Sequence, residues 1–202
     1  MTTYAKLSIC SCAVALAFSV TGCASREVVR GSDDPSIDGR AMSTSLDKDD
    51  MQRSLHKLLN NLRESPVMQT WRAHQAPKDV VAIAPFINTT SEHIDSQLDV
   101  MLTETETWLV QSHVVSLIDR ERQLEMIRQV EGSQHPVFDP KRIPQYGKQL
   151  NAKYYITGKV GAADERTESA RRVQYFIFMK VINVETSEIE WQEKAEITKM
   201  VR

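Results

Sequence analysis

The chain has little cysteine, and none of it lies in the part that is expected to fold. Only three cysteines occur in the 202 residues, the last at position 23. The region after Cys23 therefore has neither a disulfide nor a thiolate metal site, and burial alone must stabilise it. The formal net charge is −2, so the basic surplus typical of nucleic-acid-binding domains is absent. Past the N-terminal region, no apolar run reaches the roughly 20 residues of a membrane-spanning helix.

Catalytic motifs are also missing. The sequence contains no G-x-S-x-G elbow, P-loop, Gly-rich dinucleotide fingerprint or H-E-x-x-H motif. The five histidines are scattered, and no two have i, i+4 ligand spacing. In the segment 92–95, Glu-His-Ile-Asp, a carboxylate could orient an imidazole for catalysis. A polar helix start, where acidic groups favour the helix dipole, is the simpler interpretation. We therefore expect no enzyme activity, no cofactor and no metal.

The N-terminus has the features of a secretory signal. Lys6 precedes an apolar run at 7–20, which the small residues Thr21 and Gly22 separate from Cys23. A positive charge, a short apolar core and small residues before a cleavage point are typical of such a signal. A cysteine directly after that point resembles the lipobox of bacterial lipoproteins. We expect residues 1–22 to be removed and Cys23 to carry several acyl chains, which together anchor almost irreversibly. The alternative is an ordinary signal peptide that contains cysteines by chance.

Residues 23–45 are predicted to form a lipidated flexible tether. The segment is polar and poor in large apolar residues, a composition that does not fold alone. Its root-mean-square span is roughly 25–30 Å, with a ceiling near ~75 Å when fully extended. No aspartate follows Cys23 directly, and this absence usually directs Gram-negative lipoproteins to the outer membrane.

Residues 46–202 are predicted to form one globular domain that begins with an amphipathic helix at 47–63. Ser45 or Asp47 can cap this helix, and Pro66 prevents its continuation. Its polar face lacks the basic bias of membrane-surface helices, so its apolar stripe is expected to face the core. The stripe consists of Met51, Leu55, Leu58, Leu59 and Leu62.

The middle of the domain is predicted to alternate between strands and helices. Such units require right-handed crossovers and parallel neighbouring strands. A turn cluster at 88–91 precedes the second helix, which Thr90 or Ser91 can cap. Leu124, Ile127 and Val130 are expected to face inward. In chain order, the expected elements are a strand at 80–86, helices at 94–111, 119–130 and 140–150, and a second strand at 114–118 between the first two of these helices.

The final third is predicted to be an antiparallel meander. Strands are expected at 154–160, at 172–184 and from Ile189 to Ile197, with a polar connection at 161–170 and a hairpin turn at 185–188. The middle strand has apolar residues on both faces and is expected inside the sheet. The predicted fold class is α/β (α+β), a mixed sheet of about five strands with helices packed on it.

Several segments, in this order, resemble the LpoB family of outer-membrane lipoproteins. The same core occurs in relatives of the TolB amino-terminal domain and of curli-secretion and flagellar lipoproteins. The likeness covers most of residues 50–198. Its matching segments are Ile83-Ala84-Pro85-Phe86-Ile87-Asn88-Thr89-Thr90-Ser91-Glu92-His93-Ile94-Asp95, Val115-Ser116-Leu117-Ile118-Asp119-Arg120, Tyr146 to Gly158 and Val181 to Trp191.

The resemblance implies a non-enzymatic activator of peptidoglycan synthesis, with a role in cell shape. It would be anchored by lipid, palmitate included, at the periplasmic face of the outer membrane. Its partner would be a non-catalytic regulatory domain of a class A penicillin-binding protein, and we expect a monomer. The tether is shorter than the family's long arms, so reach requires a thin envelope or detachment of the helix at 47–63.

No motif fixes the docking residues. Two exposed loops, 88–93 and 164–172, are the docking hypothesis, because loops often carry function; ordinary surface loops are the alternative. A structural accessory lipoprotein of a secretion or flagellar assembly is the competing function, and a wall-degrading enzyme is a third. The candidate partner-binding residues are Asn88, Thr89, Thr90, Glu92, His93, Arg166 and Arg171.

Overall fold

A computed structural model describes residues 32–201, apart from 38, 40, 75 and 132–141. It has one mixed sheet with the strand order β3-β1-β4-β5-β6, and β2 pairs with β4. The predicted fold class is confirmed; the sheet has six strands because the two-residue strand β2 is added. In chain order the elements are a 3-10 turn (Pro35–Ile37), α1 (Lys48–Arg63), α2 (Pro66–Ala73), β1 (Val80–Ile83), β2 (Ile87–Asn88), α3 (Asp95–Ser112), β3 (Ser116–Leu117), α4 (Arg120–Glu131), α5 (Ile143–Gln149), β4 (Tyr154–Arg166), β5 (Arg171–Asn183) and β6 (Ile189–Val201).

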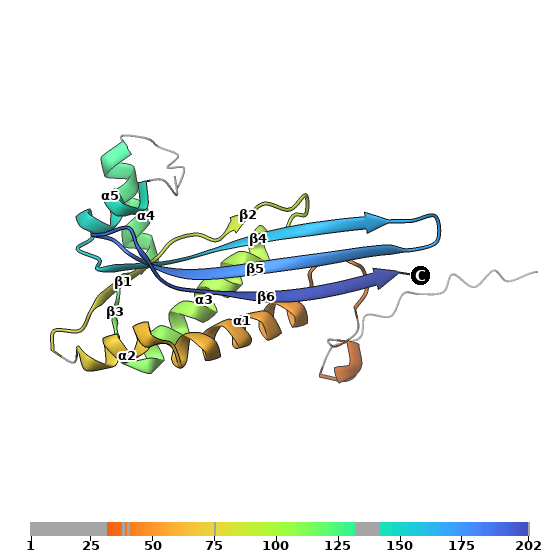
Figure 1. The fold of residues 1–202 in the computed structure, drawn as a ribbon, viewed down its shortest axis with the longest axis horizontal. Coiled ribbons are helices and arrows are strands. Elements are labelled where there is room, and N and C mark those ends of the chain that lie inside the picture. Colours follow the sequence, from red (N-terminus) through yellow and green to blue (C-terminus); the bar gives the residue numbers. More distant parts are fainter. Residues whose placement is uncertain (1–31, 38, 40, 75, 132–141, 202) are drawn as a thin grey trace, which may run out of the picture.

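Strand directions follow the prediction. β1 runs parallel to both β3 and β4, as the strand–helix–strand units require. β4, β5 and β6 are antiparallel neighbours. These three long strands extend well beyond β1 and β3 in Figure 1. β5 lies between β4 and β6, which confirms that it is an interior strand.

Helix α1 begins after the cap that the sequence predicts. The Asp47 carboxylate accepts a hydrogen bond from the Asp50 amide at 3.0 Å, and the Asp50 carboxylate accepts one from the Asp47 amide at 3.2 Å. This reciprocal arrangement satisfies amides that the first helical turn leaves unpaired. α1 contacts α3 and β6. All five residues of the predicted apolar stripe are buried.

Detachment of α1 is therefore not a source of extra reach. Leu55, Leu58 and Leu62 are at most 1% exposed, and burying each such side chain contributes about 1.5–3 kcal/mol. Removing the helix would also uncover β6 and α3, against which it packs. α1 is part of the domain core, and only the chain before it can act as a tether.

Helix α2 follows α1 almost at once and was missed by the prediction. Pro66 occupies its first turn, where a missing N–H leaves no hydrogen bond unmade. The Ser65 hydroxyl caps the helix by accepting a hydrogen bond from the Met68 amide at 3.3 Å. The helix carries Trp71, which is fully buried and meets the Tyr154 ring edge to face at 5.5 Å. Pro66 thus starts a helix rather than only preventing one.

The predicted polar connection at 161–170 is wrong for most of its length. β4 continues to Arg166 because each residue from Gly161 onward pairs with β5. Glu165 of β4 lies directly opposite Arg172 of β5 and is bonded to it, and Asp164 is bonded to Arg171, two positions along β5 from its own cross-strand partner. Opposite charges on neighbouring strands stabilise the pairing. The hairpin loop is reduced to residues 167–170.

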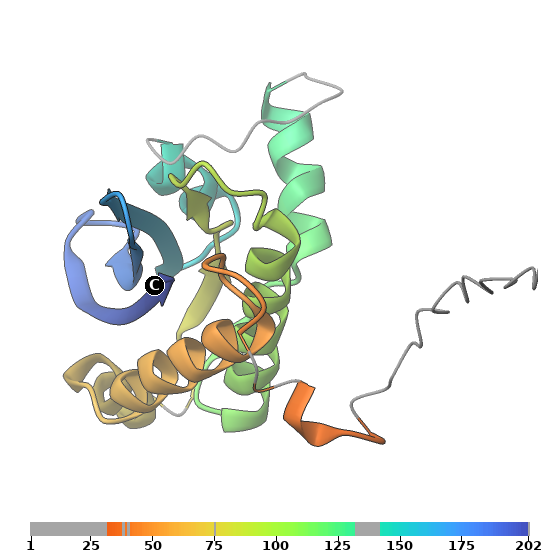
Figure 2. The ribbon, with the colours of Figure 1, turned by 90° about the vertical axis from the view of Figure 1, so that its right-hand side faces the viewer.

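The sheet has an inner and an outer face. Helices α1 and α2 contact β6, and α3 packs on α1 and β3, so these helices cover the inner face (Figures 1 and 2). Helix α4 contacts β1 and helix α5 contacts β4, at one end of the outer face. Gly147 of α5 has no room for a Cβ, which would lie 2.6 Å from Val184. The small cluster under these helices comprises Ala82, Ala84, Tyr146, Ala152, Tyr155 and Val184.

Two local predictions are wrong. The N-cap of α3 is Ile94, and no side chain caps it. The Thr90 hydroxyl instead accepts a hydrogen bond from the Glu92 amide at 3.1 Å, inside the preceding loop. Leu124 of α4 is 36% exposed, whereas Gln123 is buried and donates to the Ile118 carbonyl at 3.0 Å. The burial of Ile127 and Val130 lies outside the described residues.

Candidate functional site

The loop at 88–93 is closed by its own side chains. Asn88 donates to the Glu92 carbonyl at 2.8 Å and accepts a bond from the Thr90 amide at 2.9 Å. The Thr89 hydroxyl donates to the carbonyl of Val160 on β4 at 2.7 Å. Small polar side chains that bond to nearby backbone favour such turns. The loop is therefore held in one conformation against the sheet, and Glu92 is aimed away from solvent.

Glu92 connects this loop to the far ends of β4 and β5. Its carboxylate accepts a hydrogen bond from the Tyr175 hydroxyl, which also lies 2.9 Å from the Thr44 carbonyl. Arg171 donates to the Thr44 hydroxyl at 2.9 Å and to the Asp164 carboxylate at 2.8 Å. We call these five residues the tip network. The structure thus brings together two residues predicted from separate loops, Glu92 and Arg171.

Charge and burial explain the ionisation of the tip network. Bonds from Arg171 and Arg166 lower the pKa of Asp164 to about 2. Burial, together with the neighbouring Glu92 carboxylate, raises the pKa of Tyr175 above its ordinary value. At neutral pH, Asp164 is thus an anion paired with arginine, and Tyr175 keeps its proton as a donor. Neither group is poised to exchange a proton near neutrality.

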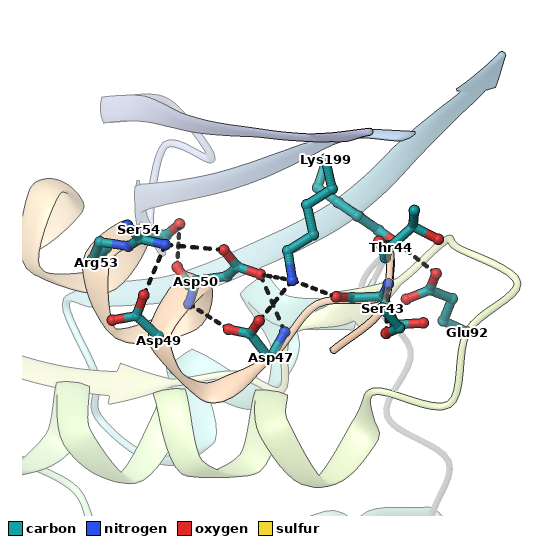
Figure 3. A network of polar contacts seen from close by, with 11 residues as sticks. Ser43, Thr44, Asp47, Asp49, Asp50, Arg53, Ser54, Glu92 and Lys199 are labelled. Carbon is teal, nitrogen blue, oxygen red and sulfur yellow. Dashed lines mark hydrogen bonds and ion pairs between the residues drawn. The ribbon is translucent and has the colours of Figure 1, made fainter. Parts of the chain in front are cut away.

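A second group of contacts, shown in Figure 3, centres on Lys199 of β6. Its ammonium lies 2.7 Å from Asp47, 2.5 Å from Asp50 and 2.7 Å from the Ser45 carbonyl. Burial works against the charged ammonium, but its bonds to the two carboxylates raise the pKa of Lys199. Burial also opposes the Asp47 anion, but the bond and charge of Lys199 together with the bonds from Asp50 outweigh it and lower the pKa of Asp47.

Together, the Lys199 contacts and the tip network hold residues 43–47, which we call the N-terminal strap. Thr44 and Leu46 of the strap are buried, and Arg171, Tyr175 and Lys199 bond to it from the sheet. Figure 3 shows the strap and Lys199 facing each other. The arrangement satisfies charged groups and fixes where the chain enters the domain. The predicted domain boundary at residues 45 and 46 stays a prediction.

The remaining candidate residues lie apart from these contacts or are only loosely connected to them. Arg166 bonds to Asp164 at 3.1 Å on an exposed hairpin, and His93 is exposed beside Glu92. Cys23 lies outside the described residues. Over the described part of the chain, no group of three or more acidic, histidine or cysteine residues is arranged to hold a metal ion. Among the described helices, none is long and apolar enough to cross a membrane.

The outer face of β4, β5 and β6 carries a feature that the prediction missed. Phe178 of β5 lies directly opposite Lys159 on one side and Lys194 on the other. Lys180 follows two residues later on the same face, because side chains alternate along a strand. Phe176 and Phe178 are half-buried, whereas Ile177 between them is fully buried. The available signal in the sequence was the alternation of Phe176, Phe178 and Lys180 along one strand. Which lysines lie opposite Phe178 depends on the register of the neighbouring strands, which the sequence alone does not set.

Comparisons with known proteins give one family. The family model described as peptidoglycan-synthase activator LpoB matches residues 50–197. Among solved structures, the LpoB C-terminal domain from Salmonella enterica is 16% identical, covers 73% of this chain and 98% of its own, and has a TM-score of 0.49. The Escherichia coli domain is 17% identical, covers 64% and 94%, and has a TM-score of 0.41. Lipoprotein GNA1162 from Neisseria meningitidis is 11% identical, covers 60% and 83%, and has a TM-score of 0.44. A comparison with curated proteins finds no match.

Proposed function

The chain belongs to the LpoB family of peptidoglycan-synthase activators, and from this premise we propose that it is an outer-membrane lipoprotein that binds and activates a class A penicillin-binding protein. Members of this family are regulatory activators, so the chain is not an enzyme. Docking on a non-catalytic domain of the synthase would serve regulation, since it leaves the active sites free.

The observation that carries this proposal is the extent of the family match. Residues 50–197 reach from the first turn of α1 into β6, the last strand. The match is therefore to the whole folded domain rather than to one motif. A binding partner activates an enzyme only if it has higher affinity for the active conformation than for the inactive one. A rigid domain with a fixed surface can supply that difference.

The proposed anchor is the acylated Cys23. The 20 residues from Ala24 to Ser43 separate it from Thr44, the first buried position of the strap. Fully extended, such a segment spans about 70–75 Å. The fixed strap sets this limit, because the core helix α1 does not lengthen the tether. We therefore propose that the domain works close to the outer membrane and meets a synthase that extends toward it.

Glycan polymerisation by purified class A synthases tests the function. Each synthase of the host is assayed with and without residues 24–202, which contain every described element. We expect a faster rate with one synthase, saturating as the added domain is increased. Heat-denatured domain is the control. If no synthase from the host is stimulated, the proposal is wrong.

Affinity capture from the host separates this function from the accessory role. Acylated protein solubilised in a non-ionic detergent is captured after cross-linking in cells. Recovery of a penicillin-binding protein supports the proposal. Recovery of secretion-pore or flagellar basal-body components in its place would support a structural accessory lipoprotein. Mass spectrometry of the captured protein tests acylation at Cys23 in the same sample.

A further inference from the structure

The outer face concentrates basic and aromatic groups at the centre of the three long strands. Lys159 and Lys194 flank Phe178 from the neighbouring strands, and Lys180 lies two residues along β5. Directly opposite positions in an antiparallel pair have Cβ atoms about 5 Å apart. Phe178 is therefore surrounded by three lysines within a short distance. We call Lys159, Phe176, Phe178, Lys180 and Lys194 the lysine–phenylalanine patch.

The charges of the patch are only partly compensated. Lys194 pairs with Glu196, and its ammonium lies 5.6 Å from the centre of the Phe176 ring. Lys159 and Lys180 have no acidic partner among the described residues. The whole chain has a net charge of −2, so this positive patch runs against the overall charge. An unpaired positive surface attracts and orients an acidic partner during association.

The patch also has the exposure expected of a binding surface. Phe176 and Phe178 are half-buried at the centre of the three long strands, whereas Tyr175, Ile177 and Met179, which alternate with them on the inner face, are fully buried. Helices α4 and α5 lie at the far end of the outer face, near Tyr155 and Val184 (Figure 1). Large aromatic anchors enclosed by charged groups are typical of the residues that contribute most to binding. The strands on both sides are paired over 12 or more residues, so little ordering is needed on binding.

From these observations we propose that the lysine–phenylalanine patch is the surface that docks on the synthase, and that it receives an acidic face of the synthase's non-catalytic domain. This inference rests on the proposed function and adds to it the docking face and the charge of the partner. Phe178 would enter an apolar pocket of that face, and Lys159 and Lys180 would pair with carboxylates around the pocket. The tip network would then serve to hold the strap and not to bind.

The test measures binding of the full acylated chain in non-ionic detergent to each purified class A synthase of the host. The test variant Lys159→Glu/Lys180→Glu is compared with Lys57→Glu/Arg122→Glu, which makes the same charge change on exposed positions of α1 and α4. We expect the test variant to lose about thirtyfold or more in affinity, the scale of a residue cluster central to an interface. The control variant should stay within about twofold of the unchanged chain, as peripheral charges contribute little.

Two further measurements separate the outcomes. The neutral variant Lys159→Gln/Lys180→Gln should show an intermediate loss of affinity. Raising the salt concentration should weaken synthase binding by the unchanged chain more than binding by either variant. Equal losses in the test and control variants, or no loss in either, would overturn the docking face while leaving the proposed function intact. If the unchanged chain binds no synthase, both proposals fail. Circular dichroism checks that each variant is folded.

A photo-cross-linking residue at position 178 identifies the occupant directly in cells. An adduct with the synthase supports the proposal. An adduct with a second copy of this chain, or with lipid or glycan alone, overturns it. The same residue at the exposed position 69 of α2, on the opposite side of the sheet, is the control and should give no synthase adduct.

Discussion

The two faces of β5 carry large apolar side chains in different surroundings. Ile177 on the inner face is fully buried, and its cross-strand neighbours are Val160 and Ala195. Phe178 on the outer face is half-buried, and its cross-strand neighbours are two lysines. Adjacent residues of one strand thus differ in what they can do. Apolar residues with apolar neighbours hold the fold, and apolar residues among charges stay available to a partner.

The difference between the inner and outer faces of β5 is tested most strongly by replacing Ile177. Its replacement by alanine leaves a cavity between the sheet and the inner helices, so we expect a loss of about 3–4 kcal/mol in the free energy of unfolding. Urea denaturation of residues 24–202 measures this loss. Phe178→Ala, one position along, removes a larger side chain from the outer face and should cost about 1 kcal/mol. Equal losses at the two positions would show that the outer face is as buried as the inner one.

Replacing Lys199 should have the next largest effect on the free energy of unfolding, because Lys199 is a charged residue on the inner side of β6. Its side chain is 10% exposed and that of Asp50 is 4% exposed. Lys199→Met would leave the buried Asp50 carboxylate with only Arg53 at 3.3 Å and the Asp47 amide at 3.2 Å as partners, at a cost of about 3 kcal/mol in the free energy of unfolding. Lys194→Met on the outer side of the same strand is the control and should change little, because its ion pair is exposed. A similar small effect at both lysines would contradict the buried role of Lys199.

The pKa shifts of Lys199 and its partner Asp47 predict how stability depends on pH. The pKa of Asp47 is lowered below its ordinary value of 3.8, so its contribution is present above about pH 4 and is lost as the pH falls through the lowered pKa. The pKa of Lys199 is raised above 10.5, so its contribution is present below that pH and is lost as the pH rises through the raised pKa. Lys199→Met should remove the share of the alkaline loss that Lys199 causes and weaken the acid loss, while Lys153, Tyr155 and Tyr175, whose pKa values are also raised, keep the rest of the alkaline loss. Thermal unfolding across pH 2–12 measures both, in steps of about one unit.

Two glycines of β4 differ in how tightly they are packed, and their replacement should have a smaller effect on stability. A Cβ at Gly158 would lie 2.8 Å from the Phe86 ring and 2.9 Å from the Phe178 carbonyl, whereas a Cβ at Gly161 would meet only Thr89, at 3.5 Å. Gly158→Ala should therefore cost about 2 kcal/mol in the free energy of unfolding, because the backbone itself must shift. Gly161→Ala should be close to neutral. If Gly161→Ala is the more costly of the two, the packing described around Gly158 is wrong.

The parts of the fold set by local patterns were predictable from the sequence. The stripe and cap of α1 and the strand alternation of β5 depend on neighbours close in the chain. The extension of β4 through Asp164 to Arg166 was not predictable from polarity, because these charges pair only after the hairpin forms. Helix α2 was missed because Pro66 both ends one helix and favours the start of another.

In the candidate site, too, single residues could be chosen from local patterns, but the contacts between distant segments could not be predicted. Glu92 and Arg171 were chosen as loop residues, and the structure brings both to Tyr175 and Thr44. Thr44 lies 127 residues from Arg171, and Ser45 lies 154 residues from Lys199. No spacing rule within one segment reports contacts over such separations. The same limit hid the lysines around Phe178, which depend on the register of three strands.

The smallest predicted effect concerns the strap. It tests whether the tip network holds the strap in place or docks on the synthase. Tyr175→Phe keeps the buried ring and removes the hydroxyl that bonds to Glu92 and to the Thr44 carbonyl, so we expect a loss of about 1 kcal/mol in the free energy of unfolding. The strap should open more often, and hydrogen exchange of the Leu46 amide should become faster, while that of β5 changes little. Thr44→Val, which loses only the Arg171 bond, should give a weaker form of the same result. Affinity for the synthase should stay unchanged in both variants, because the lysine–phenylalanine patch is intact. A large loss of affinity without faster exchange would assign docking to the tip network instead and would restore the loops at 88–93 and 164–172 as the binding surface.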